Sequence, residues 1–201
     1  HELKLAGEKA VELTMRVANQ RERGASFVSV WLSDEFRNGY GMSYGGIYPM
    51  KNRVGVRIFK LRDNVVPFND TKQPKFSSEA GEPQPEEMKS LSDLVSTGQF
   101  IDLHLRIEQA SPDAPVTLTL WNTGSQEVAD TSYEEPLLRL EDDGKGSVFH
   151  GADGSYGPVF NLDELAYIGF SEAQFLNKDL TPEEQAAEPY MAIRQLDVRA
   201  V

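Results

Sequence analysis

Short stretches in which apolar and polar side chains alternate recur along this chain and constrain its fold more than any other feature. In residues 101–107, Ile101, Leu103, Leu105 and Ile107 alternate with polar or charged residues. Residues 11–17, 27–32, 54–59 and 116–121 show the same period of two. Because successive side chains of a β-strand point to opposite faces, this pattern is typical of antiparallel strands with one buried face. β-Branched and aromatic residues also predict strands within 165–170 and 191–201.

Helical signals are short and local. Thr181, Pro182 and Glu184 supply an N-cap, a first-turn proline and a capping-box glutamate. We expect a second short helix within residues 85–95 and a mobile loop over the polar run 69–85. Many short strands with so few helices predict an all-β fold, a two-sheet antiparallel jelly-roll sandwich with one or two short helices.

A glycine-rich stretch carries three evenly spaced tyrosines, Tyr40, Tyr44 and Tyr48. We expect an aromatic loop there that suits carbohydrate contact, because each tyrosine has a flat apolar body and a polar tip. The alternative is a glycine-hinged hairpin whose tyrosines close one end of the core.

The length, charge and cysteine content of the chain exclude several classes of protein. A chain of 201 residues can bury about 70% of its unfolded surface, so we expect one domain over residues 1–201. No apolar run reaches the roughly 18 residues of a membrane span. The net charge of −12 argues against a nucleic-acid partner. Cysteine is absent, which excludes thiol chemistry and disulfides. A start at His1 suggests a mature or excised piece of a larger chain.

Several segments also follow a familiar order along the chain. They are Asp34 to Met42 after a strand, Gln99 to Ile107, the strand and turn from Leu118 to Gly124, Tyr167 to Phe170, and Ala192 to Val198. In this order the chain resembles the concanavalin A-like lectin and glucanase superfamily, whose jelly rolls include laminin G-like modules. The resemblance implies an architecture that lectins, binding modules, lyases and hydrolases share, and architecture alone does not settle activity.

The face opposite the aliphatic residues carries the candidate site. Both tryptophans of the chain fall on that face, and exposed aromatic patches usually mark a contact site. Aromatic rings stack on sugar rings, while charged side chains make directional hydrogen bonds to hydroxyls. We therefore expect a common ligand-binding hollow formed by Trp31, Tyr40, Arg57, Asp102, His104, Arg106 and Trp121. The structural alternative is that other parts of the chain cover the tryptophans and that His104 is an ordinary hydrogen-bonded side chain.

Signatures of catalysis and of metal binding are weak. Glu-x-Asp-x-x-Glu, the acidic strand pattern of a retaining glycosidase on this architecture, is missing, and so is Tyr-x-Lys-x-Gly-x-Tyr, which is typical of alginate-lyase-like jelly rolls. Acidic runs at 141–144 and 153–155 do not fit an EF-hand. We expect no cofactor and no catalytic metal, with one structural calcium ion as the alternative.

Taken together, these features predict a non-catalytic polysaccharide- or oligosaccharide-binding module of a secreted or cell-surface protein, located outside the cell or on its surface. One alternative is a glycan-active enzyme, a polysaccharide lyase or a glycoside hydrolase, in which His104 or a tyrosine acts as base and an arginine neutralises a uronate. The other is a structural adhesion domain without a sugar site.

Overall fold

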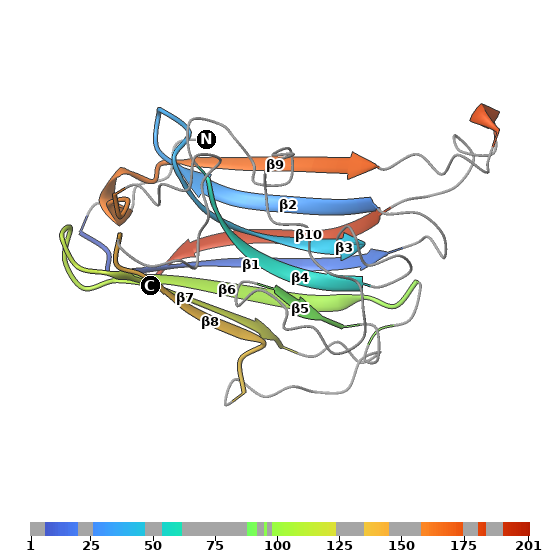
Figure 1. Cartoon of the computed structure of the whole chain (residues 1–201), viewed down its shortest axis with the longest axis horizontal. Helices are drawn as coiled ribbons and strands as arrows, with labels where there is room; N and C mark the ends of the chain where they lie inside the picture. The colour runs from blue at the N-terminus through green and yellow to red at the C-terminus, as the bar shows by residue number, and fades with distance from the viewer. Residues whose placement is uncertain are drawn as a thin grey trace.

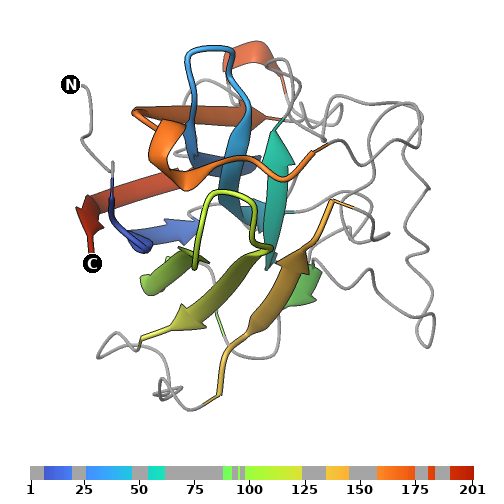
Figure 2. The ribbon, with the colours of Figure 1, turned by 90° about the vertical axis from the view of Figure 1, so that its left-hand side faces the viewer.

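Two five-stranded antiparallel sheets pack face to face in the computed structural model (Figure 1). The structure describes residues 7–19, 26–46, 54–61, 88–91, 95, 98–123, 135–144, 158–174, 181–183 and 191–201. Sheet A has the strand order β10 (Met191–Ala200), β1 (Ala10–Asn19), β6 (Ile101–Gln109), β7 (Val116–Asn122) and β8 (Leu138–Asp142). Sheet B has the order β5 (Met88–Ser90), β4 (Val54–Leu61), β3 (Gly39–Gly46), β2 (Ser26–Ser33) and β9 (Tyr167–Gln174). Figure 2 looks roughly along the strands and separates the two layers.

The aliphatic half of each alternating pattern lies between the two sheets. From sheet A, Val11, Leu13, Met15, Val17, Ile101, Leu103, Leu105, Ile107, Val116, Leu118 and Leu120 are fully buried there. From sheet B, Val28, Val30, Leu32, Val56 and Ile58 join the same cluster. Burial of these side chains removes apolar surface from water, which is the main favourable contribution to folding. The predicted all-β, two-sheet antiparallel sandwich is confirmed.

The tyrosine- and glycine-rich stretch is a strand rather than a loop. It forms β3, which pairs with β2 on one side and with β4 on the other. Tyr40 and Tyr44 point inward and are fully buried, so the alternative in which the tyrosines close the core describes these two. Gly41 faces outward, where a Cβ would lie 2.4 Å from the carbonyl oxygen of Val30. Glycine is therefore required there by close approach of another backbone rather than by a turn. Tyr48 lies outside the described residues.

The two expected short helices lie only partly within the described residues. The helix expected within 85–95 is wrong for residues 88–90, which form β5 and pair with the edge of β4. Backbone pairing across the sheet outweighs the weak local helical signal of that segment. At the second site, Pro182 and Glu183 are helical directly after Thr181, and residues 184–190 lie outside the described part. A 3-10 turn spans Leu162–Glu164, capped by the side chain of Asn161. The polar run 69–85 also lies outside the described residues.

The two sheets are offset rather than stacked edge over edge. β10 contacts β2 across the sandwich, and β1 and β6 contact β3. β9, which continues sheet B beyond β2, therefore has no described strand of sheet A opposite it, and it lies at the outer margin of the molecule in Figure 1. Among the described strands, this offset leaves the inner face of β9 uncovered.

A buried polar network joins the two sheets at the opposite end of the strand order. The carboxylate of Asp142 in β8 accepts a hydrogen bond of 2.6 Å from the Tyr40 hydroxyl and pairs with the Lys60 ammonium at 2.5 Å. Lys60 also donates to the carbonyl oxygen of Pro158, and the backbone N–H of Phe160 donates to the Tyr40 hydroxyl. Burial, with the Asp142 charge next in size, raises the pKa of Tyr40 above its ordinary value. Each charge is therefore compensated where water is excluded.

Replacement of Asp142 tests this cross-sheet pair. Asp142→Ala removes the carboxylate that pairs with the Lys60 ammonium, whose side chain is only 3% exposed. We expect a loss of roughly 3–5 kcal/mol in the free energy of unfolding, measured by urea denaturation. Glu141→Ala, at the neighbouring exposed position, should change it by less than about 0.5 kcal/mol. Equal effects of the two variants would contradict the role given to the pair.

Candidate functional site

The seven residues predicted to line one hollow do not share a surface. Trp31 and Arg57 lie on the outer face of sheet B, whereas Asp102, His104, Arg106 and Trp121 lie on the outer face of sheet A. Tyr40 points between the sheets. The expectation of a common hollow is therefore wrong. Alternation assigns a side chain to one side of its own strand, but the outward sides of two packed sheets point in opposite directions.

Three of the seven residues, His104, Arg106 and Trp121, do meet on sheet A, in a cluster around Glu12. The Glu12 side chain is 5% exposed, and its carboxylate pairs with Arg106 at 3.2 Å and with Arg199 at 2.5 Å. Nε2 of His104 lies 3.5 Å from the same carboxylate. The His104 ring packs at 5.6 Å against the indole of Trp121. Asp102, two residues before His104 on the same face of β6, pairs with Arg16 at 3.6 Å. On this face, charged side chains of opposite sign therefore lie next to one another around carboxylates that are largely shielded from water.

His104 stays neutral at lower pH than an ordinary histidine. Burial lowers its pKa below the usual value, and the attraction of Glu12 opposes this shift, while Arg199 and Arg106 add to it. Because the folded-state pKa is the lower one, the unfolded chain takes up a proton first as the pH falls. The contribution of His104 to stability is thus fully present above about pH 6.5 and is lost as the pH falls toward the folded-state pKa.

The pH dependence of stability tests this environment. The free energy of unfolding should fall between pH 7 and pH 5, and part of that fall should disappear in His104→Gln, which cannot take up the proton. Urea denaturation of both proteins at the two pH values measures the difference. A fall of the same size in both would show that His104 does not carry the effect.

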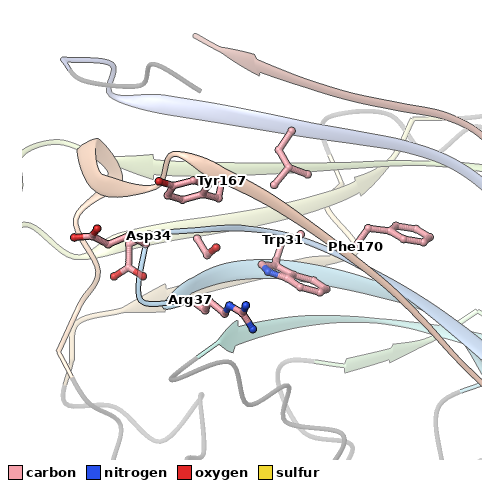
Figure 3. A pocket seen from close by; sticks show the side chains of 9 residues that line it. Trp31, Asp34, Arg37, Tyr167 and Phe170 are labelled. Carbon is pink, nitrogen blue, oxygen red and sulfur yellow. The ribbon is translucent and has the colours of Figure 1, made fainter. Parts of the chain in front are cut away.

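On sheet B, a depression of about 500 Å³ opens beside Trp31 (Figure 3). Its lining comes from the end of β2, the following turn and β9: Trp31, Ser33, Asp34, Glu35, Arg37, Tyr167, Ile168, Gly169 and Phe170. We call it the Trp31 depression. In the view of Figure 3 the indole lies between Phe170 on one side and Asp34 and Arg37 on the other. Strands far apart in the sequence thus bring aromatic and charged side chains together.

Glycine and phenylalanine hold the indole of Trp31 in place. Gly169 lies opposite Trp31 in the β2–β9 register, and a Cβ at Gly169 would lie only 2.0 Å from an indole carbon. The indole therefore rests on bare backbone. On the other side the ring of Phe59 meets it edge-on, with centroids 6.4 Å apart. Trp31 remains partly exposed and Tyr167 is 46% exposed, so both rings present surface to a ligand.

A rigid turn positions the charged side of the depression. Both carboxylate oxygens of Asp34 accept hydrogen bonds from Asn38, one from its backbone N–H at 2.7 Å and one from its side chain at 3.0 Å. Arg37 adopts φ +63°, a left-handed conformation that is uncommon for residues other than glycine. Such strain concentrates at functional sites. No described residue forms an ion pair with the exposed guanidinium of Arg37 or with the exposed carboxylate of Glu35.

The remaining two predicted residues, Tyr40 and Arg57, are buried and lie outside the Trp31 depression. Tyr40 bonds to Asp142 in the core. Arg57 lies on the outer face of sheet B but is only 4% exposed and does not line the Trp31 depression. The sequence reasoning missed Arg37 and Tyr167 as site residues. The sequence feature that could have indicated this site is Gly169, which lies opposite Trp31. It can be recognised only when β2 and β9 are known to pair.

Acidic turns do not form a metal site in the described part of the chain. No group of three or more His, Asp or Glu side chains there is arranged to hold a metal ion. In the run 141–144, the oxygens of Asp142 already bond to Lys60, Tyr40 and the N–H of Gly144. The run 153–155 lies outside the described residues.

Two further findings bear on the class of protein. Among the described residues, no helix has the length and apolar character needed to cross a bilayer. The chain matches no protein-family model, and a search of curated proteins finds no match either.

Proposed function

We propose that the chain is a non-catalytic glycan-binding module and that its ligand, a polysaccharide or oligosaccharide, binds in the Trp31 depression. One observation carries the proposal: a partly exposed indole and an exposed tyrosine ring line a hollow of about 500 Å³, and on its rim Glu35 and Arg37 are exposed and form no ion pair with a described residue. That volume falls within the roughly 300–1,000 Å³ of typical small-ligand sites.

The two kinds of lining suit the two kinds of surface on a sugar. The flat C–H face of a pyranose ring can stack on Trp31 or Tyr167, which supplies most of the affinity. Glu35 can accept hydrogen bonds from hydroxyl groups, and the fork of Arg37 can donate them, which fixes orientation. In an open depression the charged side chains of Glu35 and Arg37 lose less hydration than they would in a closed cavity, so the desolvation cost of binding is smaller.

Binding fits the depression better than turnover does. A glycosidase needs two available carboxyl groups, and both oxygens of Asp34 are engaged by Asn38. His104, the candidate base for lyase chemistry, lies on the outer face of the other sheet and is 4% exposed. A base must reach the proton that it removes, and His104 is placed away from the hollow that would hold the substrate.

The wider setting belongs to the same proposal. A resemblance to concanavalin A-like jelly rolls is supported by the two-sheet antiparallel architecture, which many proteins of other functions share. A polysaccharide ligand implies a secreted or cell-surface location and a place within a larger glycan-processing protein. The absence of cysteine is compatible with that location.

The two tryptophans supply a matched pair of variants. After a glycan array has identified a ligand, Trp31→Ala should raise its dissociation constant about tenfold or more, because the stacking surface is removed. Trp121→Ala should leave the constant unchanged, since that indole packs on His104 on the other sheet. Titration calorimetry measures both, and circular dichroism confirms that each variant is folded.

Other outcomes assign a different role. Loss of affinity in Trp121→Ala alone would move the site to sheet A. Unsaturated products absorbing in the ultraviolet would establish a lyase. Failure to bind any glycan on the array would overturn the proposal and favour a structural adhesion domain.

A further inference from the structure

Apolar side chains are exposed along the side of the sandwich where β9 and β10 form the edges of the two sheets. Ile168 and Phe170 of β9 are 42% and 49% exposed, and Ile193 and Leu196 of β10 are each 37% exposed. We call these four residues the β9/β10 seam. Exposed clusters of large apolar residues usually mark an interaction surface.

The offset of the two sheets explains this exposure. Ile168 lies opposite Leu32 and Phe170 lies opposite Val30 in the β2–β9 register, so both face the inner side of sheet B. Ile193 and Leu196 lie opposite Val17 and Met15 of β1 and face the inner side of sheet A. β2 is covered by β10, but β9 has no described strand across from it. A strand added to sheet A beyond β10 would cover Ile168 and Phe170.

The edge of β10 is suited to such pairing. Among the described residues, β10 pairs with β1 alone, and it runs for ten residues without proline or lysine. Its one irregularity, between Arg16 and Val17 in the register with β1, leaves the stretch from Gln195 to Ala200 regular. Long regular edges of this kind present unpaired backbone N–H and C=O groups to another strand.

A second copy of this chain does not fit the edge. Twofold pairing of two β10 edges would place the two A sheets side by side. Because β10 lies over β2 and β9 projects one strand further, β9 of one copy would then occupy the space of β2 of the other. The overhang of β9 thus blocks edge-to-edge dimers and leaves room for a single strand.

We propose that the β9/β10 seam binds an extended segment of another polypeptide, which adds to β10 as an antiparallel strand and covers β9. Its inward side chains are apolar and pack on Ile168 and Phe170. Its outward side chains extend the charge pairs of β10. An acidic residue lies opposite Arg199, which binds Glu12 but has a side chain that is 72% exposed, and a basic residue lies opposite the exposed Asp197, which accepts a hydrogen bond from Gln195. This inference does not depend on glycan binding, although Ile168 and Phe170 at the edge of sheet B also line the Trp31 depression.

Synthetic strands of equal composition test the proposal. A bound antiparallel segment runs against β10, so its residue opposite Arg199 comes before its residue opposite Asp197. A nine-residue peptide in which every second residue is valine and whose centre is Glu-Val-Lys therefore places Glu opposite Arg199 and Lys opposite Asp197. A peptide with central Lys-Val-Glu places like charges together. We expect saturable binding of the first, with the second weaker by about threefold to tenfold, by fluorescence anisotropy.

Variants and amide exchange locate the bound peptide. Phe170→Asp should abolish binding, whereas Phe36→Asp, at a 69% exposed phenylalanine on the turn after β2, should leave it unchanged. In the unaltered protein, the matched peptide should slow hydrogen exchange at the β10 amides. Unchanged exchange in β10, equal affinity of the two peptides, or a dimer in sedimentation with β10 protected would each overturn the proposal.

Discussion

Aliphatic side chains packed between two pleated sheets are the constraint on which the rest of the structure depends. Each strand sends alternate residues into this layer, so the intervening residues must face outward. Trp31 and the Glu12 cluster are consequences of that geometry, one on each outer face. The same layer ends where the sheets are offset, and there the inner residues of β9 become a surface instead of a core.

Polar groups in this molecule divide into those already satisfied and those available to a ligand. Asp142 is bonded by Lys60 and Tyr40, and Glu12 is held by Arg106 and Arg199. Disturbing such groups leaves a charge buried without its partner, so they are poorly suited to exchange partners with a substrate. Arg37 and Glu35 differ, because both are exposed and neither pairs with a described residue. Their position beside the Trp31 indole is what distinguishes that depression from the charged face of sheet A.

Periodicity was enough to predict most of the strands with polar outer faces, but it missed β8, where the alternation lasts only five residues. It was also not enough where glycine occupies the outer positions. β3 carries glycine at 39, 41 and 45, which removes the polar half of the alternation and imitates a loop. The candidate site was harder to predict than the strands. Alternation placed Trp31 and Trp121 outward, but which sheet each strand joins depends on pairing between distant segments. The contact of Trp31 with Gly169 follows from such pairing and has no local sequence signature. Buried partners such as Lys60 and Asp142 likewise come from opposite sheets.

The presence of only two tryptophans allows the central claim, that the ligand meets sheet B at Trp31, to be tested in one spectrum. A ¹H–¹⁵N correlation spectrum contains one indole Nε1–H signal from each, and Trp31→Phe identifies which is which by the signal that it removes. On titration with a bound oligosaccharide, the account predicts that the Trp31 signal moves with saturation and that the Trp121 signal stays in place. Movement of the Trp121 signal alone, or of neither, would contradict it.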